Sequence, residues 1–183
     1  IGTSSLRRQA QLNLLRNDIT IVPMRGNIDT RISKLKNKEF DGIVLSLAGI
    51  QMLNLNKEVQ EIFSTKQMLP AIGQGAIALQ CKEKDQKTLD ILKAINDKET
   101  YYCIQAERAV LEAIGGDCDT AIGGLAKISY GKISLKSELF SNDGNLKFEA
   151  MGSGNFKEAK EIGYKIGKEL LKKAGSNFTT QGR

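Results

Sequence analysis

Residues 124–150, GLAKISYGKISLKSELFSNDGNLKFEA, contain three strand-like runs separated by turn residues. In the middle run Ile133, Leu135 and Leu139 alternate with polar side chains, which is the period of a strand with one buried face. The SNDGN segment before the last run has the composition of a hairpin turn. This stretch therefore predicts a three-stranded sheet.

Helical patterns flank the predicted sheet. Residues 98–114, KETYYCIQAERAVLEAI, form a long helical pattern before the strands. The chain closes with an amphipathic pattern whose apolar residues recur at helical spacing: Ala159, Ile162, Ile166 and Leu170. A small α+β domain is therefore expected over residues 97–183.

The first 75 residues alternate between helical and strand-like patterns. Helices are expected at LRRQAQLNLLR (6–16), with Leu6, Ala10, Leu14 and Leu15 at near-helical spacing, and at RGNIDTRISKL (25–35), with Asn27 as its cap. Strands are expected at DITIVP (18–23) and in DGIVLSLAGI (41–50), which leads into another helix. This alternation favours an α/β domain with a parallel or mixed sheet.

A connector rich in glycine follows, with Pro70, Gly73 and Gly75. Beyond it, AIALQC (76–81) predicts a strand and QKTLDILKAIN a helix from about residue 86 to residue 96. A domain boundary is expected near Asp97.

Charge and hydropathy limit the class of partner. The chain has 183 residues and a net charge of +6. Residues 1–40 carry eight Lys and Arg against three Asp and Glu, a difference of +5, and residues 41–183 carry nineteen against eighteen, or +1. An anionic partner, nucleic acid or a small polycarboxylate, is expected at the first segment. No apolar run approaches the roughly 20 residues that span a bilayer, so no membrane partner is expected.

Histidine is absent, and the three cysteines, Cys81, Cys103 and Cys118, are widely spaced. This composition excludes histidine-based catalytic triads and the usual zinc sites, so no metal site is expected. An odd number of cysteines without a C-x-x-C pair is typical of a protein in a reducing, cytoplasmic location. The chain begins at Ile1 without a signal-peptide pattern and is interpreted as a piece of a longer protein.

Two stretches are candidates for anion binding. In GTSSLRRQ (2–9), hydroxyl residues at a helix start expose N–H groups, and Arg7 and Arg8 can each bind a carboxylate or phosphate through two bonds. A well-capped surface helix with solvated arginines explains this stretch equally well. In MRGNIDTR (24–31), Arg25 follows a strand, at the sheet edge where α/β proteins bind ligands, and Arg31 lies in the next helix. A solvated side chain is the alternative for Arg31.

The AIGQGA segment (71–76) contains G-x-G but lacks a third glycine, so it is a weak dinucleotide motif. A tight crossing between domains is favoured there, with Gln74 available to hydrogen-bond a ligand.

Cys118 lies between Asp117 and Asp119 on a glycine-rich loop. Both carboxylates and the end of the preceding helix disfavour a thiolate, so a catalytic thiol of low pKa is not expected. A buried structural cysteine is the common alternative. A functional role requires a partner electrophilic enough for a neutral thiol, as in permanent attachment of a cofactor.

Five segments together resemble the porphobilinogen deaminase, or hydroxymethylbilane synthase, family over essentially the whole chain. They are GTSSLRRQAQ, RGNIDTRISKL, DGIVLSLAGI, LPAIGQGAIALQC and GGDCDTAIGGLA. Members of this family join four porphobilinogen units head to tail with release of ammonia, giving hydroxymethylbilane for tetrapyrrole (haem) biosynthesis. The resemblance implies a dipyrromethane cofactor, the primer of the chain, held through a thioether to Cys118.

The resemblance also implies the binding residues, because each pyrrole carries an acetate and a propionate. The cofactor would be held by Thr3, Ser4, Ser5, Arg7, Arg8 and Arg31, and the substrate porphobilinogen by Arg25, Arg31 and Gln74. The family's proton-handling aspartate lies in a first domain that is mostly missing here, so no catalytic residue is assigned and the chain alone is expected to be inactive. Met52 stands where many members have arginine, and Ala121 where proline is common.

By the same resemblance, residues 1–75 form the second domain, a mixed-sheet domain of the periplasmic-binding-protein type (type II). Residues 76–96 belong to the missing first domain, and residues 97–183 form the third domain, which anchors the cofactor. A monomer is expected, with the missing N-terminal domain as its partner.

Two other classes of protein stay open. A ligand-sensing or transport domain could share the sheet and the arginines but would not need Cys118. A nucleic-acid-binding protein would use the basic first segment, but the chain has no tryptophan, 5% aromatic residues and no recognised nucleic-acid motif, so no nucleic-acid partner is expected.

Overall fold

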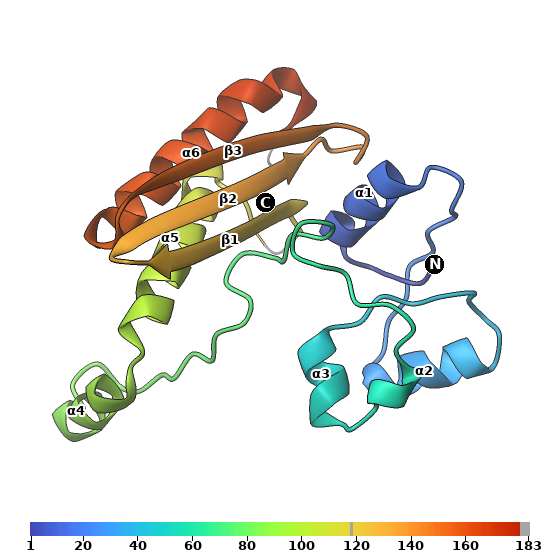
Figure 1. Ribbon diagram of the computed structural model, residues 1–183, viewed down its shortest axis with the longest axis horizontal. Coiled ribbons are helices and arrows are strands. Elements are labelled where there is room, and N and C mark those ends of the chain that lie inside the picture. The colour runs from blue at the N-terminus through green and yellow to red at the C-terminus, as the bar shows by residue number, and fades with distance from the viewer. Residues whose placement is uncertain (118, 180–183) are drawn as a thin grey trace.

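The three predicted strands pair as an antiparallel sheet in the order β1-β2-β3 in the computed structural model, which describes residues 1–117 and 119–179. β1 spans Ile122–Ser129, β2 Lys132–Phe140 and β3 Lys147–Asn155 (Figure 1). Leu135 in β2 lies opposite Ala126 in β1 and Gly152 in β3. The predicted three-stranded sheet is confirmed, and the described part of the chain is a mixed α/β structure.

Two long helices, α5 (Lys98–Ile114) and α6 (Ala159–Ala174), pack on the same face of this sheet (Figure 1). The Asp97 carboxylate caps α5 by accepting the Thr100 N–H at 2.7 Å. The helix is terminated by Gly115, whose φ of 70° lies in the left-handed region. Short 3-10 helices at Phe156–Glu158 and Gly175–Asn177 flank α6. Both helices were predicted from their apolar spacing.

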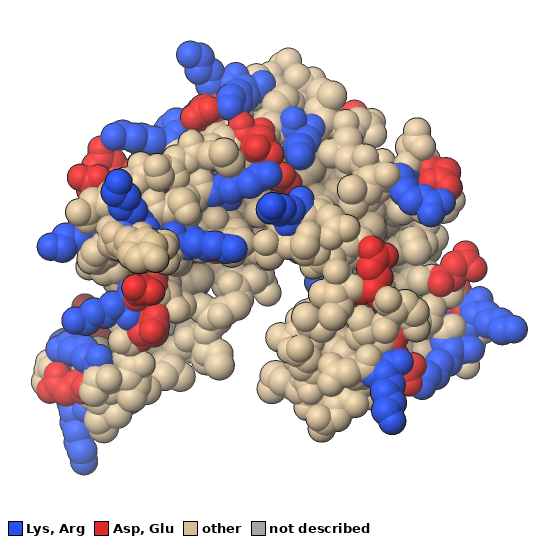
Figure 2. Space-filling model, in the orientation of Figure 1, with Lys and Arg blue, Asp and Glu red and all other residues tan. Residues whose placement is uncertain are grey.

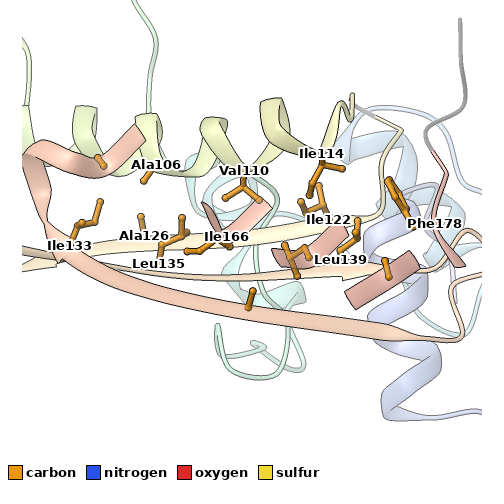
Figure 3. Close-up of a cluster of buried hydrophobic side chains, with 14 residues drawn as sticks. Ala106, Val110, Ile114, Ile122, Ala126, Ile133, Leu135, Leu139, Ile166 and Phe178 are labelled. Atoms are coloured by element: carbon orange, nitrogen blue, oxygen red, sulfur yellow. The ribbon is translucent and has the colours of Figure 1, made fainter. Parts of the chain in front are cut away.

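The core lies between the sheet and these helices. Figure 3 shows Ala106, Val110 and Ile114 of α5 pointing toward the inner face of the sheet. The most buried residues of this core also include Ile133, Leu135 and Leu139 of β2 and Leu170 of α6. These β2 residues are the alternating set that predicted the strand, so its buried face is confirmed.

The N-terminal segment contains α1 (Leu6–Leu15), α2 (Ile28–Lys36), α3 (Leu47–Met52) and a 3-10 helix at Asn56–Glu58. Asn27 caps α2 as predicted, accepting the Thr30 N–H at 2.9 Å. The buried face of α1, however, differs from the expected one. Its leucines Leu6, Leu14 and Leu15 are about half exposed, and α1 buries Ala10 and Leu12 together with the polar residues Arg7 and Gln11.

The strands expected around residues 18–23 and 41–50 are reduced to two isolated parallel bridges, from Gly2 to Val22 and from Gly2 to Ile43. The strand expected at residues 76–81 does not form. A strand needs a partner backbone along its length, and in the described residues these segments meet one only at the bridges.

The predicted helix after the connector is α4 (Gln86–Ile95), and none of its residues is buried. Figure 1 shows α4 at the far end of an irregular segment, away from α1, α2 and α3. Within the described residues, no helix combines the length and the hydropathy that a membrane crossing needs.

Candidate functional site

The first predicted anion-binding stretch folds into a hydrogen-bonded turn at the start of α1. Ser5 Oγ accepts the Arg8 N–H at 3.4 Å and caps the helix, and Thr3 Oγ1 accepts the Ser5 N–H at 3.2 Å. Ser4 Oγ donates to Met24 O at 2.8 Å and accepts from Met24 N at 2.9 Å. Ser4 therefore joins this turn to the second predicted stretch, which begins at Met24.

Arg8 and Arg31 lie close enough to repel each other. Arg8 Nη1 donates to Val44 O at 2.8 Å, and burial followed by the positive charge of Arg31 lowers the pKa of Arg8. Arg31 is half-buried, with its Nε donating to Gly26 O at 2.7 Å. Arg25 is exposed one residue before Gly26. The structure thus brings together side chains from both predicted stretches.

Arg7 is the most buried arginine of this group, at 8% exposed. Its Nη1 donates to Leu69 O at 2.5 Å. Its Nε is buried and has no hydrogen-bond partner among the described residues. Burial, followed by the charge of Arg8, lowers the pKa of Arg7 to about 10. A buried guanidinium with an unused N–H and lowered pKa favours an anion that accepts this hydrogen.

Arg7, Arg8 and Arg31, whose charges act on one another, are together with Arg25 of the loop before α2 hereafter called the arginine cluster. Within residues 1–117 and 119–179, none of these four arginines forms an ion pair with an Asp or Glu. Carboxylates matched to guanidinium groups form the strong, charge-assisted class of hydrogen bonds. The cluster is therefore suited to a ligand with several carboxylates.

Gln74 lies in the crossing from the N-terminal segment to the C-terminal domain. Its side chain is exposed, and the residue before it, Gly73, donates its N–H to Glu107 Oε2 at 2.8 Å. Glu107 Oε1 accepts the Ala126 N–H at 2.9 Å. Sequence reasoning missed Glu107, because an internal glutamate in a helix gives no signal that its carboxylate is buried.

Cys118 lies outside the described residues, but its neighbours form an ordered turn. Asp117 N donates to Thr120 Oγ1 at 2.9 Å, and Asp119 N donates to Asp117 Oδ1 at 3.0 Å. Both hydrogen bonds are local and join residues on either side of the cysteine.

A cavity of about 310 Å³ separates this loop from α1. Leu6 and Gln9 line it on the α1 side, facing Asp117, Asp119 and Asp143. Three acidic side chains make this cavity unsuitable for a polycarboxylate, because like charges repel at short range. An anionic ligand is favoured at the arginine cluster instead.

Three further residues bear on the site. Met52 is 84% exposed at the end of α3 and supplies no charge there. Ala121 is half-buried beside β1. Burial, with the charge of Glu107, raises the pKa of Cys103, which disfavours a reactive thiolate. No group of three or more His, Cys, Asp or Glu that could hold a metal occurs in the described part of the chain.

These features define a mixed α/β protein with buried and half-buried arginines, unpaired among the described residues, that suit an anionic ligand. Residues 1–90 match the family model described as porphobilinogen deaminase, dipyromethane cofactor binding domain, and residues 101–172 match that of the porphobilinogen deaminase C-terminal domain. The chain belongs to the porphobilinogen deaminase family.

Curated relatives named porphobilinogen deaminase are similar along nearly the whole chain. A protein from Ehrlichia chaffeensis is 44% identical over 93% of the chain, and one from Coxiella burnetii is 41% identical over 97%. A protein from Syntrophomonas wolfei is 37% identical over 100% of the chain. The aligned regions cover 57%, 58% and 60% of these relatives' lengths, so the chain spans less than two thirds of each.

Proposed function

We propose that this chain is part of a hydroxymethylbilane synthase, which joins four porphobilinogen units head to tail with release of ammonia. The observation that carries the proposal is the unpartnered, buried Nε of Arg7 beside the charges of Arg8 and Arg31. Such a site favours carboxylate ligands, and every pyrrole unit of the substrate and product carries two carboxylates. Membership of the porphobilinogen deaminase family supports the same activity.

The residues of this chain fit a dipyrromethane cofactor. Two pyrrole rings carry four carboxylates, and the arginine cluster offers guanidinium groups that no Asp or Glu of the described residues neutralises. We assign the cofactor carboxylates to Arg7, Arg8 and Arg31, with hydroxyl or N–H contacts from Thr3, Ser4 and Ser5. We assign the porphobilinogen carboxylates to Arg25 and Arg31, with Gln74 as a further hydrogen-bonding group.

The cofactor, when bound, supplies the primer to which porphobilinogen units are added. Cys118 is the proposed anchor, through a thioether, and its neighbouring aspartates argue for capture by a neutral thiol rather than a thiolate. The arginines bind and orient the carboxylates, and the hydrogen bond from Asp117 N to Thr120 Oγ1 stabilises the turn around the cysteine. The proton-handling aspartate of the family is proposed to lie outside this chain.

We also propose a division into domains. Residues 1–75 would form the second domain of the family, with the periplasmic-binding-protein arrangement, and the two parallel bridges at Gly2 support a parallel sheet there. Residues 97–183 would form the cofactor-anchoring domain.

Residues 76–96 would belong to the first domain, the rest of which would lie in the part of the relatives that this chain does not span. Their apolar side chains support this, because Ile77 is 93% exposed and Leu79, Ile91 and Ile95 are more than half exposed. Figure 2 shows a deep notch in this face of the molecule, which in the orientation of Figure 1 separates the α4 region from α2 and α3. A further domain contacting residues 76–96 would cover this apolar surface.

The test is turnover of porphobilinogen by a completed protein, in which this chain follows the unmatched part of the Coxiella burnetii relative. We expect the completed protein to consume porphobilinogen and release hydroxymethylbilane and ammonia, and the chain alone to be inactive. Cys118→Ser should abolish turnover, and Cys103→Ser, a matched change of the same residue type, should preserve it. A completed protein that loads Cys118 but makes no hydroxymethylbilane would overturn the proposal.

A further inference from the structure

The backbone of Leu69 is held by the side chain of Gln11. Gln11 Oε1 accepts the Leu69 N–H at 2.6 Å, and Gln11 Nε2 donates to Leu69 O at 3.1 Å. Both residues are buried, at 4% and 3% exposed. A carboxamide that bonds both the N–H and the C=O of one residue restrains the backbone on either side of its Cα, because the two groups belong to successive peptide planes.

The same Leu69 carbonyl also receives the guanidinium of Arg7. Arg7 lies one helical turn before Gln11 on the buried face of α1, and its Nη1 donates to Leu69 O at 2.5 Å. The direction of this carbonyl therefore sets the rotation of the guanidinium, and with it the direction of the unpartnered Nε. Gln11 acts on the Arg7 guanidinium through this shared acceptor, and its Nε2 also donates to the backbone O of Arg7 at 3.4 Å.

The crossing after Leu69 is fixed on its far side to the C-terminal domain. Pro70 O accepts the Gly124 N–H of β1 at 2.9 Å. The side chain of Ile72 packs against the core, over the space that the absent side chain of Gly124 leaves. Leu69 is therefore held between α1 and β1, and a change at Gln11 leaves the contacts on the β1 side in place.

We propose that Gln11 is a positioning residue that holds the Arg7 guanidinium in the direction needed to bind a carboxylate of the cofactor. This inference rests on the proposed function and deepens it. Gln11 itself touches no ligand in this account. Its contribution passes through Leu69 O, so its loss should impair carboxylate binding more than stability alone explains.

The decisive variant is Gln11→Leu, which keeps the approximate length and volume of the side chain and removes its two hydrogen bonds to Leu69 and the longer one to Arg7 O. Leu12→Ala is the matched control. Leu12 is buried on the same helix, and its apolar side chain makes no hydrogen bond to the Leu69 backbone, unlike Gln11. Both variants lose stability, so thermal unfolding gives the baseline against which function is compared.

Two readouts separate positioning from stability in the completed protein. The first is the rate at which apo-protein incubated with porphobilinogen gains the dipyrromethane mass on the Cys118 peptide. The second is the KM for porphobilinogen against kcat in the loaded protein. For Gln11→Leu we expect loading slowed about tenfold and a KM raised about tenfold with kcat changed less, as misplacement of a binding group predicts.

Leu12→Ala should load and bind like the unchanged protein. The inference is overturned if the Gln11→Leu protein gains the cofactor at the same rate as the Leu12→Ala protein and has an unchanged KM for porphobilinogen. That result would leave the proposed function intact. Failure of the unchanged protein to load or turn over porphobilinogen would instead contradict the proposed function. The two failures are therefore distinguishable.

Discussion

The carboxylate of Glu107 in α5 joins Gly73 of the crossing to Ala126 of β1. The carboxylate accepts the Gly73 N–H at 2.8 Å and the Ala126 N–H at 2.9 Å, and Glu107 is only 3% exposed. β1 is an edge strand of the sheet, so the Ala126 N–H on its outer side has no neighbouring strand to bond. Glu107 therefore supplies the acceptor for the Ala126 N–H at this edge and holds Gly73, the residue that precedes Gln74.

Replacing Glu107 with Gln tests this connection. Glutamine offers one acceptor where the carboxylate offers two, so one buried N–H loses its partner, at a cost of about 1–3 kcal/mol. Burial raises the pKa of Glu107 above the ordinary value of a glutamate. A raised pKa in the folded state favours folding at low pH, and this contribution is lost as the pH rises through the folded-state pKa.

Urea unfolding of both proteins across a pH series measures the effect. The stability advantage of the unchanged protein over Glu107→Gln should be largest below pH 4.5 and should shrink as the pH rises. An advantage that grows with pH would show that the hydrogen bonds to the ionised carboxylate outweigh its burial.

Ile72 and Gly124 should be energetically coupled. A Cβ at Gly124 would collide with Ile72 Cδ1, so Gly124→Ala should destabilise by about 1–3 kcal/mol through overpacking. Ile72→Val removes Cδ1, and in its presence Gly124→Ala should cost less by at least about 0.5 kcal/mol. A double-mutant cycle by chemical unfolding measures this difference, and strictly additive costs would contradict the contact.

Gly163 allows α6 to lie against α5. A Cβ at this position would overlap Ala106 O and lie 2.9 Å from Ala106 C, both of which are backbone atoms. The two helices must therefore separate in Gly163→Ala, which should destabilise by about 1–3 kcal/mol or more. Gly42→Ala is the control, because its Cβ would meet only the flexible end of Ile1 within 4 Å in the described structure. Equal unfolding midpoints for the two variants would argue against close helix packing.

Arg8→Lys should weaken ligand binding although it preserves the charge. Lysine cannot donate to Val44 O and at the same time present the planar pair of N–H groups that a carboxylate accepts. We expect the KM for porphobilinogen of the completed protein to rise about tenfold, which corresponds to about 1.4 kcal/mol of binding. Arg16→Lys is the matched control, since Arg16 is exposed and pairs with Asp18. A KM that responds equally to both changes would contradict the assignment of Arg8.

The sequence was sufficient for elements that depend on local pattern. The alternation of Ile133 and Leu135 located β2, and the apolar spacing around Ile166 located α6, because each period matches its own secondary structure. Asn27 was recognisable as a cap from its place before the helix.

The sequence was insufficient where distant partners decide the outcome. The leucine pattern of α1 suggested the wrong buried face, because Gln11 is buried by hydrogen bonds to Leu69, 58 residues away. The strand expected at residues 76–81 required a neighbouring strand that the described residues do not supply. The arginines of the candidate site were identified, but only the structure distinguishes the buried Arg7 from the exposed Arg25.

The central claim is that Cys118 carries the cofactor, and the most direct measurement is its mass. The completed protein is denatured and digested, and the peptide containing Cys118 is compared with those containing Cys81 and Cys103. We predict the added mass of a dipyrromethane on the Cys118 peptide and none on the other two. An unmodified Cys118 in a protein that still converts porphobilinogen to hydroxymethylbilane would contradict the account.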